Sequence, residues 1–485
     1  MQKCGMGWGA LMVNDLNTGR IHLIGICGTA MAALACMLQE KGWQVSGSDA
    51  GSYPPMSDIL NARGLSFVPG YRPEQLDAGL DLVVVGNVAA RHNPEVQRAQ
   101  ELGLPCRSLP EVLWSEFLQQ ATTRVVVAGT HGKTTTASLA AWVLQAAGRQ
   151  PSFLIGGLVN NFAANYQLGS PSLFVLEGDE YNAAYFDRKA KFHHYRPTHL
   201  LLTGLEMDHA DIFSGIEAVE EEFRWLIARM PASGVIVAAA DCSRLATLLK
   251  ESPCQVITYG DHEAADCRLL DCRPQGGGSL LTVLGVDRQP FTLPTATIGR
   301  HNAANTLAVY LLARNLGISR QQAAAGLESF AGVKRRQEVI QCWRQTIFIS
   351  DFAHHPTAIA KTLEALRAQY GDHRLVAVFE PRTATSRRNL FQQEFARAFD
   401  AADEVLIAPV YRGELLPDDQ RLDTVRLAAD LAVRGIAAEA AASVEEIFDR
   451  LVREAGSPRL VVLMSTGDFA GLYARIQGLE VAVGV

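Results

Sequence analysis

Strand-like apolar runs alternate with helical stretches along nearly the whole chain, in three successive blocks. Residues 20–121 contain the runs IHLIGI, QVSGSD and DLVVVGN and end in the helical LPEVLWSEFLQQ. Residues 122–330 contain LFVLEGDE, THLLLTGLE and GVIVAAAD, followed by a turn at PQGGGS that indicates an antiparallel insert. Residues 331–485 restart the alternation with TIFISDFAHH, HRLVAVFEP, EVLIAPVY and LVVLMSTGD. This pattern predicts an α/β protein, with residues 1–19 as an N-terminal extension.

The second block opens with VVVAGTHGKTTTASLAAWVLQAAG, which predicts a buried strand, a glycine turn and a helix. Gly129 and Gly132 let backbone N–H groups approach an anion at the helix N-terminus, where the helix dipole is positive. Lys133 adds a full charge, and Thr134 offers a hydroxyl to a magnesium ion. Val127 stands where the common G-x-x-x-x-G-K-[ST] loop has its first glycine. The segment predicts a nucleotide-phosphate site, and the alternative is a helix that merely follows a glycine turn.

The first block opens with HLIGICGTAMAALACMLQEKG, again a strand, a glycine turn and a helix. Asp49 ends the next strand, as in a dinucleotide-binding fingerprint. Gly25, Cys27 and Ala30 stand where that fingerprint needs three glycines, so the NAD signal is weak. The segment from Gly25 to Met31 predicts a pyrophosphate cradle, and the alternative is a turn without a ligand.

Polar residues follow two apolar strands of the second block. Glu177 ends SLFVLEGDEY, a position suited to a magnesium ligand beside a phosphate loop. Asp208 and His209 follow THLLLTGLE, where a structural role for the histidine is the alternative. In GRHNAANTLAV, Asn302 and Asn305 lie one helical turn apart and either contact an adenine edge or cap the helix.

Composition narrows the class of protein. The 485-residue chain has a formal net charge of -7, which argues against a nucleic-acid or membrane surface. Its nine cysteines form no C-x-x-C pair, which favours reduced thiols in a cytoplasm. No apolar run approaches the roughly 18 residues of a membrane helix, so membrane insertion is not expected. We expect a cytoplasmic monomer or weak dimer.

Six motifs, in order, resemble the Mur ligase family over nearly the whole chain: AGTHGKTTT, LEGDEY, DHADIF, GRHNAANTLAV, GVKRRQE and DFAHHP. The family's phosphate loop is G-T-x-G-K-[ST], so the upstream glycine is not required. The resemblance implies an ATP-dependent ligase that uses Mg²⁺ and makes an amide bond through an acyl phosphate. It also implies three domains: a Rossmann-like UDP-sugar-binding domain (20–121), a central P-loop ATPase domain (122–330) and a C-terminal Rossmann-like ligase domain (331–485).

Within the family, one branch is similar to this chain in four further segments: GICGTAMA, SDAGSYPPMS, VVGNVAARHNPEV and YNAAYFDRKAKFHHYRP. That branch joins UDP-N-acetylmuramate to the murein tripeptide L-alanyl-γ-D-glutamyl-meso-diaminopimelate in peptidoglycan recycling. The alternative is the branch that adds free L-alanine in de novo synthesis. The stretch after EGDEY is interpreted either as a solvated loop or as basic groups that place an anionic peptide; its charged residues are Asp187, Arg188, Lys189, Lys191 and Arg196.

The resemblance also implies roles for individual residues. The implied catalytic residues are Lys133, Glu177 and His209, and the implied metal ligands are Thr134, Glu177 and His209. The implied ATP contacts are Gly129, Thr130, His131, Gly132, Lys133, Thr134, Thr135, Asn302, Arg336, Asp351 and His354, with His355 nearby. The implied UDP-sugar contacts are Gly25, Gly28, Thr29, Ala30, Met31, Asp49 and Asn87. The implied peptide contacts are Arg382, Arg387 and Arg388. No lysine lies between Lys191 and Lys250, so no carbamylated lysine is expected after the DH motif.

Two other classes of protein remain as alternatives. The first glycine turn and Asp49 are compatible with a nucleotide-binding oxidoreductase, which would give Lys133 and Glu177 no role. A non-catalytic ATP switch on a ligase scaffold is the other alternative, and the intact Lys133 and Thr134 argue against it.

Overall fold

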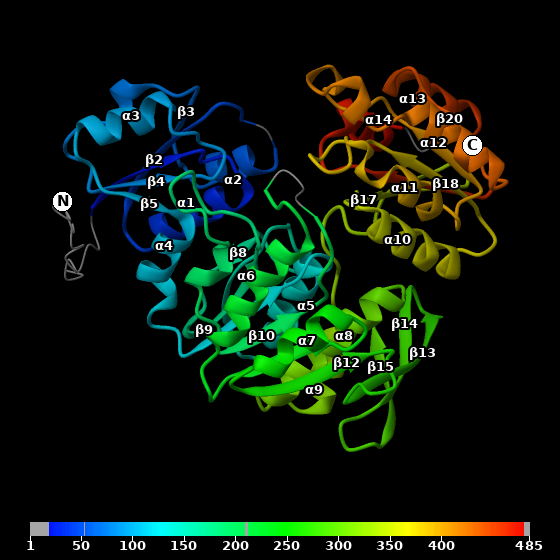
Figure 1. Cartoon of the computed structure of the whole chain (residues 1–485), viewed down its shortest axis with the longest axis horizontal. Coiled ribbons are helices and arrows are strands. Elements are labelled where there is room, and N and C mark those ends of the chain that lie inside the picture. The colour runs from blue at the N-terminus through cyan, green and yellow to red at the C-terminus, as the bar shows by residue number, and fades with distance from the viewer. Residues whose placement is uncertain (1–18, 53, 209–211, 480–485) are drawn as a thin grey trace, which may run out of the picture. The chain divides into compact units, whose positions relative to one another are not determined.

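The computed structural model describes residues 19–52, 54–208 and 212–479. These residues form two compact units (Figure 1). The first contains the chain up to Glu116 and a short later segment, Asn182–Arg188. The second contains Phe117–Tyr181 and the described chain from Lys189 onward. Residues 1–18 of the predicted N-terminal extension lie outside the described chain.

The first unit is built on a five-stranded parallel sheet in the order β3-β2-β1-β4-β5. Chain connections leave the central pair β1 and β4 in opposite directions, which makes their carboxyl ends the switch point where such sheets bind ligands. The strands are β1 (Arg20–Ile24), β2 (Gln44–Asp49), β3 (Phe67–Pro69), β4 (Leu82–Val85) and β5 (Cys106–Ser108). The helices are α1 (Thr29–Glu40), α2 (Met56–Ala62), α3 (Pro94–Glu101) and α4 (Leu109–Leu113).

The second unit begins with a ten-stranded sheet in the order β15-β14-β13-β12-β11-β10-β6-β9-β7-β8. The strands from β7 to β13 pair in parallel, and β14, β15 and β8 are antiparallel to their neighbours. The strands are β6 (Thr123–Ala128), β7 (Pro151–Leu154), β8 (Tyr166–Gln167), β9 (Ser170–Gly178), β10 (His199–Leu202), β11 (Val235–Ala239), β12 (Gln255–Gly260), β13 (Cys267–Gln275), β14 (Gly278–Leu284) and β15 (Pro290–Thr295).

The predicted antiparallel insert is confirmed, and its turn has a local cause. Gly276 and Gly277 join β13 to β14 with φ of +58° and +85°. Two consecutive positive φ values make the tight turn whose twist matches a hairpin, and glycine takes them without strain.

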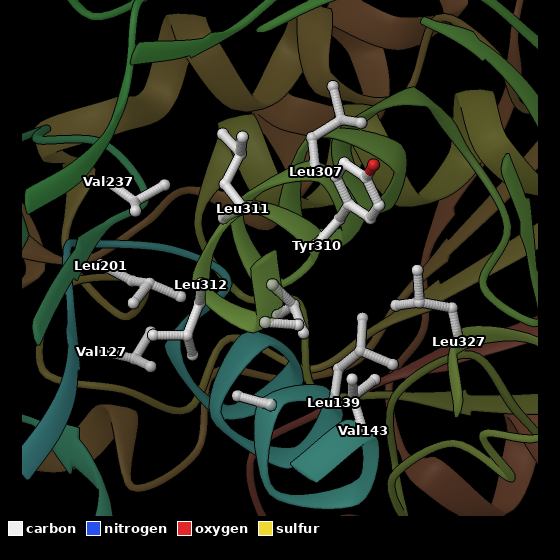
Figure 2. Packing of buried hydrophobic residues seen from close by; sticks show 14 of the residues in the cluster. Val127, Leu139, Val143, Leu201, Val237, Leu307, Tyr310, Leu311, Leu312 and Leu327 are labelled. Carbon is white, nitrogen blue, oxygen red and sulfur yellow. The ribbon is translucent and has the colours of Figure 1, made fainter. Parts of the chain in front are cut away.

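Helices of this part pack against the sheet, and they are α5 (Lys133–Ala146), α6 (Ile216–Ala228), α7 (Ser243–Leu248), α8 (Arg300–Asn315) and α9 (Arg320–Glu328). Helices α5, α8 and α9 share one cluster of buried apolar side chains with the strands. Figure 2 shows Leu139 and Val143 of α5 in one cluster with Val127 of β6, Leu201 of β10 and apolar side chains of α8. All four of these side chains are fully buried. This core fixes the start of α5 at the carboxyl ends of the central strands.

The second unit ends with a six-stranded sheet in the order β16-β17-β21-β18-β19-β20. Only the β16–β17 pair is antiparallel. The strands are β16 (Glu338–Trp343), β17 (Thr346–Asp351), β18 (Arg374–Phe379), β19 (Glu404–Ile407), β20 (Ala437–Ala440) and β21 (Arg459–Met464). The helices are α10 (Pro356–Gln369), α11 (Gln392–Ala398), α12 (Thr424–Val433), α13 (Val444–Arg453) and α14 (Leu472–Gln477). Two clusters of buried apolar side chains make up its core.

The three sheets correspond to the three blocks of the sequence pattern. The domain boundaries at residues 121 and 330 stay predictions. Among the described residues, no helix has the length and apolar character needed to cross a lipid bilayer.

Candidate active site

The phosphate loop lies at the carboxyl end of β6 and leads directly into α5. Gly129 has φ of +134°, and a Cβ added there would lie 2.8 Å from the carbonyl oxygen of Gly204. Gly132 has φ of +80° and precedes the first residue of α5. Both glycines are therefore required by backbone conformation, and Gly129 also by close approach. Because β9 and β10 flank β6 in parallel, residues that follow these three strands gather at one edge.

Lys133 lies inside this loop. Its side chain is 10% exposed, and Nζ donates to the carbonyl of Gly129 at 2.7 Å and to Glu180 at 2.9 Å. Burial lowers the pKa of Lys133, but the nearby charges of Glu180 and Asp179 outweigh burial and the pKa is raised. The ammonium group therefore stays charged at the N-terminus of α5, where the oxygens of a phosphate would collect. Thr135 lies half-buried in the same first turn.

Thr134 and Glu177 form the pair that could hold a divalent cation. The Thr134 hydroxyl donates to Glu177 Oε1 at 2.7 Å, and the backbone N–H of Gly156 donates to Oε2 at 2.8 Å. A Cβ on Gly156 would lie 2.8 Å from Glu177 Oε2. Burial raises the pKa of the Glu177 carboxyl, and the neighbouring Asp179 charge adds to this. A hydroxyl and a carboxylate oxygen held together are the ligand types that Mg²⁺ takes, so the pair fits the ion.

The third predicted metal ligand, His209, lies outside the described residues, and its role stays a prediction. Its neighbour Asp208 is 8% exposed and accepts a hydrogen bond from the Thr385 hydroxyl at 3.0 Å. His354 Nε2 lies 3.9 Å from Asp208 Oδ2. Burial lowers the pKa of His354, so the ring is neutral near pH 7.

Glu206 connects the phosphate loop to helix α10, and sequence reasoning missed it. Its backbone N–H and carbonyl pair with the Thr130 hydroxyl at 2.9 and 3.1 Å. Its carboxylate lies 3.4 Å from His131 Nε2 and accepts from the Thr357 hydroxyl at 2.7 Å. Burial raises the pKa of Glu206, but the contacts with His131 and Thr357 prevail and lower it to about 2. The sequence offered one indication of a role for Glu206, namely that it follows a predicted strand closely, in the segment LEMDH.

His355 lies beside this group. Its ring centroid is 4.8 Å from that of His131, and burial together with His131 lowers its pKa to about 4. Potential ligand atoms of His131, Glu206 and His355 all lie within 4.8 Å of one another, an arrangement compatible with a divalent ion.

Arg336 and Asp351 lie near each other, and their roles at ATP stay predictions. The guanidinium of Arg336 lies 4.8 Å from the ring centroid of Phe352. Burial lowers the pKa of Arg336, and the negative charges of Asp351 and Glu177 oppose this effect. Asp351 is 4% exposed and accepts from the backbone N–H of Gln337 at 2.8 Å. Arg336 therefore lies within electrostatic reach of both Asp351 and Glu177.

Asn302 and Asn305 do not cap α8. The N-cap residue is Gly299, and both asparagines lie inside the helix. Asn302 Nδ2 donates to the Gln337 side chain at 3.1 Å, and Asn305 Nδ2 donates to Asn302 at 3.3 Å. The capping alternative is therefore wrong, because the glycine at the helix start takes that place. A role of Asn302 at adenine stays a prediction.

The predicted UDP-sugar residues lie in the first unit, around the turn after β1. Gly25 has φ of +86°, and Gly28 precedes Thr29, the first residue of α1. Ala30 and Met31 follow in the same helical turn. The turn leaves N–H groups at a helix N-terminus, which suits an anion.

Asp49 and Asn87 of this predicted site have different surroundings, because the first is hydrogen-bonded to the backbone and the second is exposed. The Asp49 carboxylate accepts from the backbone N–H of Cys27 at 2.9 Å and of Gly51 at 3.2 Å. Asp49 therefore stabilises the glycine turn. The dinucleotide-binding fingerprint had suggested a ligand contact for this residue, not a structural role. Asn87 is exposed two residues after β4.

The three predicted peptide-binding arginines are not equivalent. Arg382 Nη1 lies 3.4 Å from both Glu380 and Asp468, and its guanidinium stacks 3.8 Å from the Tyr411 ring centroid. Arg387 Nη1 donates to the Tyr411 carbonyl at 3.3 Å, and its buried Nε has no hydrogen-bond partner in the described chain. Tyr411 thus brings Arg382 and Arg387 together. Arg388 instead forms an isolated β-bridge with Arg421.

Comparisons with known proteins agree with this arrangement. The family model described as "Mur ligase family, catalytic domain" matches residues 20–120, "Mur ligase middle domain" matches 127–313, and "Mur ligase, glutamate ligase domain" matches 335–467. The chain is 36% identical over 460 residues to UDP-N-acetylmuramate–L-alanyl-γ-D-glutamyl-meso-2,6-diaminoheptandioate ligase of Escherichia coli (strain K12), with 94% of this chain and 97% of the relative covered.

Two further known proteins are similar to this chain. A UDP-N-acetylmuramate–L-alanine ligase of Arthrobacter sp. (strain FB24) is 36% identical over 439 residues, covering 87% of this chain and 90% of the relative. The crystal structure of a murein peptide ligase from Psychrobacter arcticus 273-4 superposes with a TM-score of 0.70 at 33% identity, covering 96% of this chain and all of that chain.

A phosphate loop with a buried lysine, a hydroxyl–carboxylate pair and three α/β domains define an ATP-dependent amide ligase. The chain belongs to the Mur ligase family. The family resemblance, the three-domain α/β fold and the enzyme class predicted from the sequence are confirmed.

Proposed function

We propose that this ligase joins UDP-N-acetylmuramate to L-alanyl-γ-D-glutamyl-meso-diaminopimelate, in peptidoglycan recycling. The similarity to the Escherichia coli tripeptide ligase carries this proposal, because it extends over 94% of the chain. Addition of free L-alanine to the same nucleotide is the second candidate, since an L-alanine ligase has the same identity over 87% of the chain. We also propose that the enzyme acts in the cytoplasm, where ATP and UDP-sugars are found, as a monomer or weak dimer.

The chemistry follows from the poor electrophilicity of a carboxylate. An oxygen of the lactyl carboxylate attacks the γ-phosphorus of ATP, the bond to the bridging oxygen breaks, and ADP leaves. The acceptor amine then attacks the acyl phosphate carbonyl, inorganic phosphate leaves, and the amine nitrogen loses a proton. Positioning and charge neutralisation contribute most to such a transfer. Lys133 and the first N–H groups of α5 would supply both at the phosphates.

Magnesium ions would be held by Thr134, Glu177 and His209. Bound there, Mg²⁺ neutralises the charge that develops on the phosphoryl oxygens. The other proposed nucleotide contacts are Asn302 at adenine and Arg336, Asp351 and His354 elsewhere on ATP. The turn from Gly25 to Met31, with Asp49 and Asn87, is proposed to hold the UDP-sugar.

The enzyme must distinguish the two candidate acceptors through contacts that lie away from the reacting amine. L-Alanine and the tripeptide both present an α-amine, so discrimination needs contacts with the remote carboxylates of the peptide. Arg387 supports this assignment because its buried Nε lacks a hydrogen-bond partner in the described chain. Arginine can bind a carboxylate through two parallel hydrogen bonds, which gives both energy and geometry. We assign Arg387, with Arg382 and Arg388, to the peptide.

Phosphate release tests the proposal. Purified enzyme with ATP, Mg²⁺ and UDP-N-acetylmuramate receives either the tripeptide or L-alanine, and kcat/KM is compared. We expect the tripeptide to be used far better. A control without UDP-N-acetylmuramate should release no phosphate, which separates a ligase from an ATP switch. A higher kcat/KM for L-alanine would replace the recycling assignment by the de novo one.

A further inference from the structure

Three acidic residues lie within four positions at the end of β9, and each has a different partner. Glu177 accepts from the Thr134 hydroxyl at 2.7 Å. Glu180 pairs with Lys133 at 2.9 Å. Asp179, between them, pairs at 2.8 Å with Lys191, a residue to which neither the fold nor the proposed reaction has given a task.

Lys191 is buried, in contrast to the solvated loop or peptide-contacting role that the charge pattern suggested. Its residue is 8% exposed. Nζ donates to Asp179 Oδ2 at 2.8 Å and to the Tyr181 hydroxyl at 3.1 Å, and it lies 4.1 Å from the Tyr181 ring centroid. Its head group is thus directed at the acidic turn. The neighbouring Lys189, two residues earlier, is exposed.

Lys191 also lies close to the point where the segment Asn182–Arg188, here called the excursion, rejoins the second unit. The chain leaves the second unit after Tyr181, contributes Asn182–Arg188 to the first unit, and returns at Lys189. The backbone N–H of Lys191 donates to the Tyr181 carbonyl at 3.2 Å. Side-chain and backbone contacts of Lys191 therefore tie the segment after the excursion to Asp179 and Tyr181, which directly follow strand β9 and its residue Glu177.

Asp179 lies between two residues that contact the groups assigned to the nucleotide. Glu177 accepts from the Thr134 hydroxyl at 2.7 Å, and Glu180 pairs with Lys133 at 2.9 Å. Without a cation beside it, the Asp179 carboxylate, whose side chain is 20% exposed, would have to turn toward water or draw Lys133 toward itself. Either change displaces the groups that would meet the phosphates and Mg²⁺.

We propose that Lys191 is a positioning residue for the nucleotide site, which holds Asp179 so that Glu177 and Lys133 remain directed at ATP and its metal. The inference rests on the proposed roles of Lys133 and Glu177, and it does not depend on which acceptor the enzyme uses. It replaces a peptide-contacting role for Lys191.

The test compares Lys191→Met with the matched variant Lys189→Met, which removes an exposed lysine from the same segment. Loss of a group that orients a metal ligand typically costs about 10-fold to 100-fold in affinity or activity. We therefore expect KM for MgATP to rise by on the order of tenfold or more in Lys191→Met, with a parallel loss of Mg·ADP affinity measured by calorimetry. KM for the acceptor should stay near the wild-type value. Lys189→Met should match wild type in all three quantities.

The double variant Asp179→Asn/Lys191→Met removes both charges and keeps the inference testable if the single variant does not fold. The double variant should fold and regain much of the Mg·ADP affinity. A wild-type KM for MgATP in Lys191→Met, an increase in acceptor KM alone, or a double variant that binds Mg·ADP no better than a Lys133→Ala enzyme would each overturn the inference. The proposed acceptor fails separately, because it is decided by the tripeptide and L-alanine comparison in the wild-type enzyme.

Discussion

Replacing Lys133 by alanine should have two separable effects, one on folding and one on turnover. Glu180 is 3% exposed, and its ion pair with Lys133 is therefore buried. Removing one partner of a buried pair typically costs about 3–5 kcal/mol, because the other charge loses its compensation. The free energy of unfolding should fall by that order. Lys133→Ala/Glu180→Gln, which removes both charges, should recover most of this loss.

The effect on turnover should not be recovered by the second substitution. One preorganised group that stabilises transition-state charge contributes about 3–4 kcal/mol, which corresponds to a factor of about 10² to 10³ in rate. Because Lys133 would carry a full charge beside the transferring phosphoryl group, we expect a loss in kcat/KM at the upper end of this range or beyond. The double variant should be stable and nearly inactive.

Thermal unfolding and phosphate release measure the two effects on the same samples. Lys334→Ala removes an exposed lysine of the same unit and serves as the control. Binding of UDP-N-acetylmuramate should be retained, since its proposed site lies in the other unit. If Lys133→Ala keeps a tenth of wild-type turnover, the assignment of the phosphate loop is wrong. If the double variant is as unstable as the single one, the buried ion pair is not the cause.

Three further predictions concern stability, nucleotide binding and acceptor binding. Gly129→Ala should lower stability and weaken nucleotide binding, because φ is +134° and the new Cβ would lie 2.8 Å from the Gly204 carbonyl oxygen. Thermal unfolding and Mg·ADP calorimetry measure the two effects, and a wild-type midpoint of thermal unfolding would contradict the prediction. Burial, with the Lys361 charge, lowers the pKa of His301 to about 3, so the unfolded chain binds this proton first and stability should fall as pH drops from about 6.5 toward 3. His301→Gln should flatten that pH dependence in urea titrations, and an unchanged slope would exclude His301 as its source. Arg387→Met/Arg388→Met should raise KM for the tripeptide far more than KM for ATP, and equal changes in both would remove these arginines from the peptide site.

Local patterns predicted much of the fold, whereas contacts between distant segments remained hidden. The strand, glycine turn and helix around Lys133 could be predicted because strand burial, glycine conformation and helix start all depend on neighbouring residues. The hairpin at Gly276 and Gly277 was predicted for the same reason. That Thr134 and Glu177 lie close together could be anticipated because Glu177 ends a strand adjacent to the loop, and their role as metal ligands stays a prediction.

The errors and omissions share a physical cause. The capping alternative for Asn302 was wrong because Gly299 sets the helix start. The contacts of Glu206 with Thr357, and of Lys191 with Asp179, depend on how separate segments pack. The sequence showed a charged stretch at Lys191, but nothing in its spacing distinguishes a buried lysine from the exposed Lys189 two residues earlier.

The excursion Asn182–Arg188 makes the first unit discontinuous in sequence, and this has a consequence for folding during synthesis. Asp187 accepts from the Ser108 hydroxyl at 2.7 Å, and the Tyr185 hydroxyl accepts from Gln100 at 3.0 Å. Tyr185 also packs on the apolar cluster of that unit. A nascent chain that has reached Glu116 lacks these contacts, so the first unit acquires its final packing only after β6, α5 and β9 have left the ribosome. The order of completion along the chain is therefore not the order of the domains.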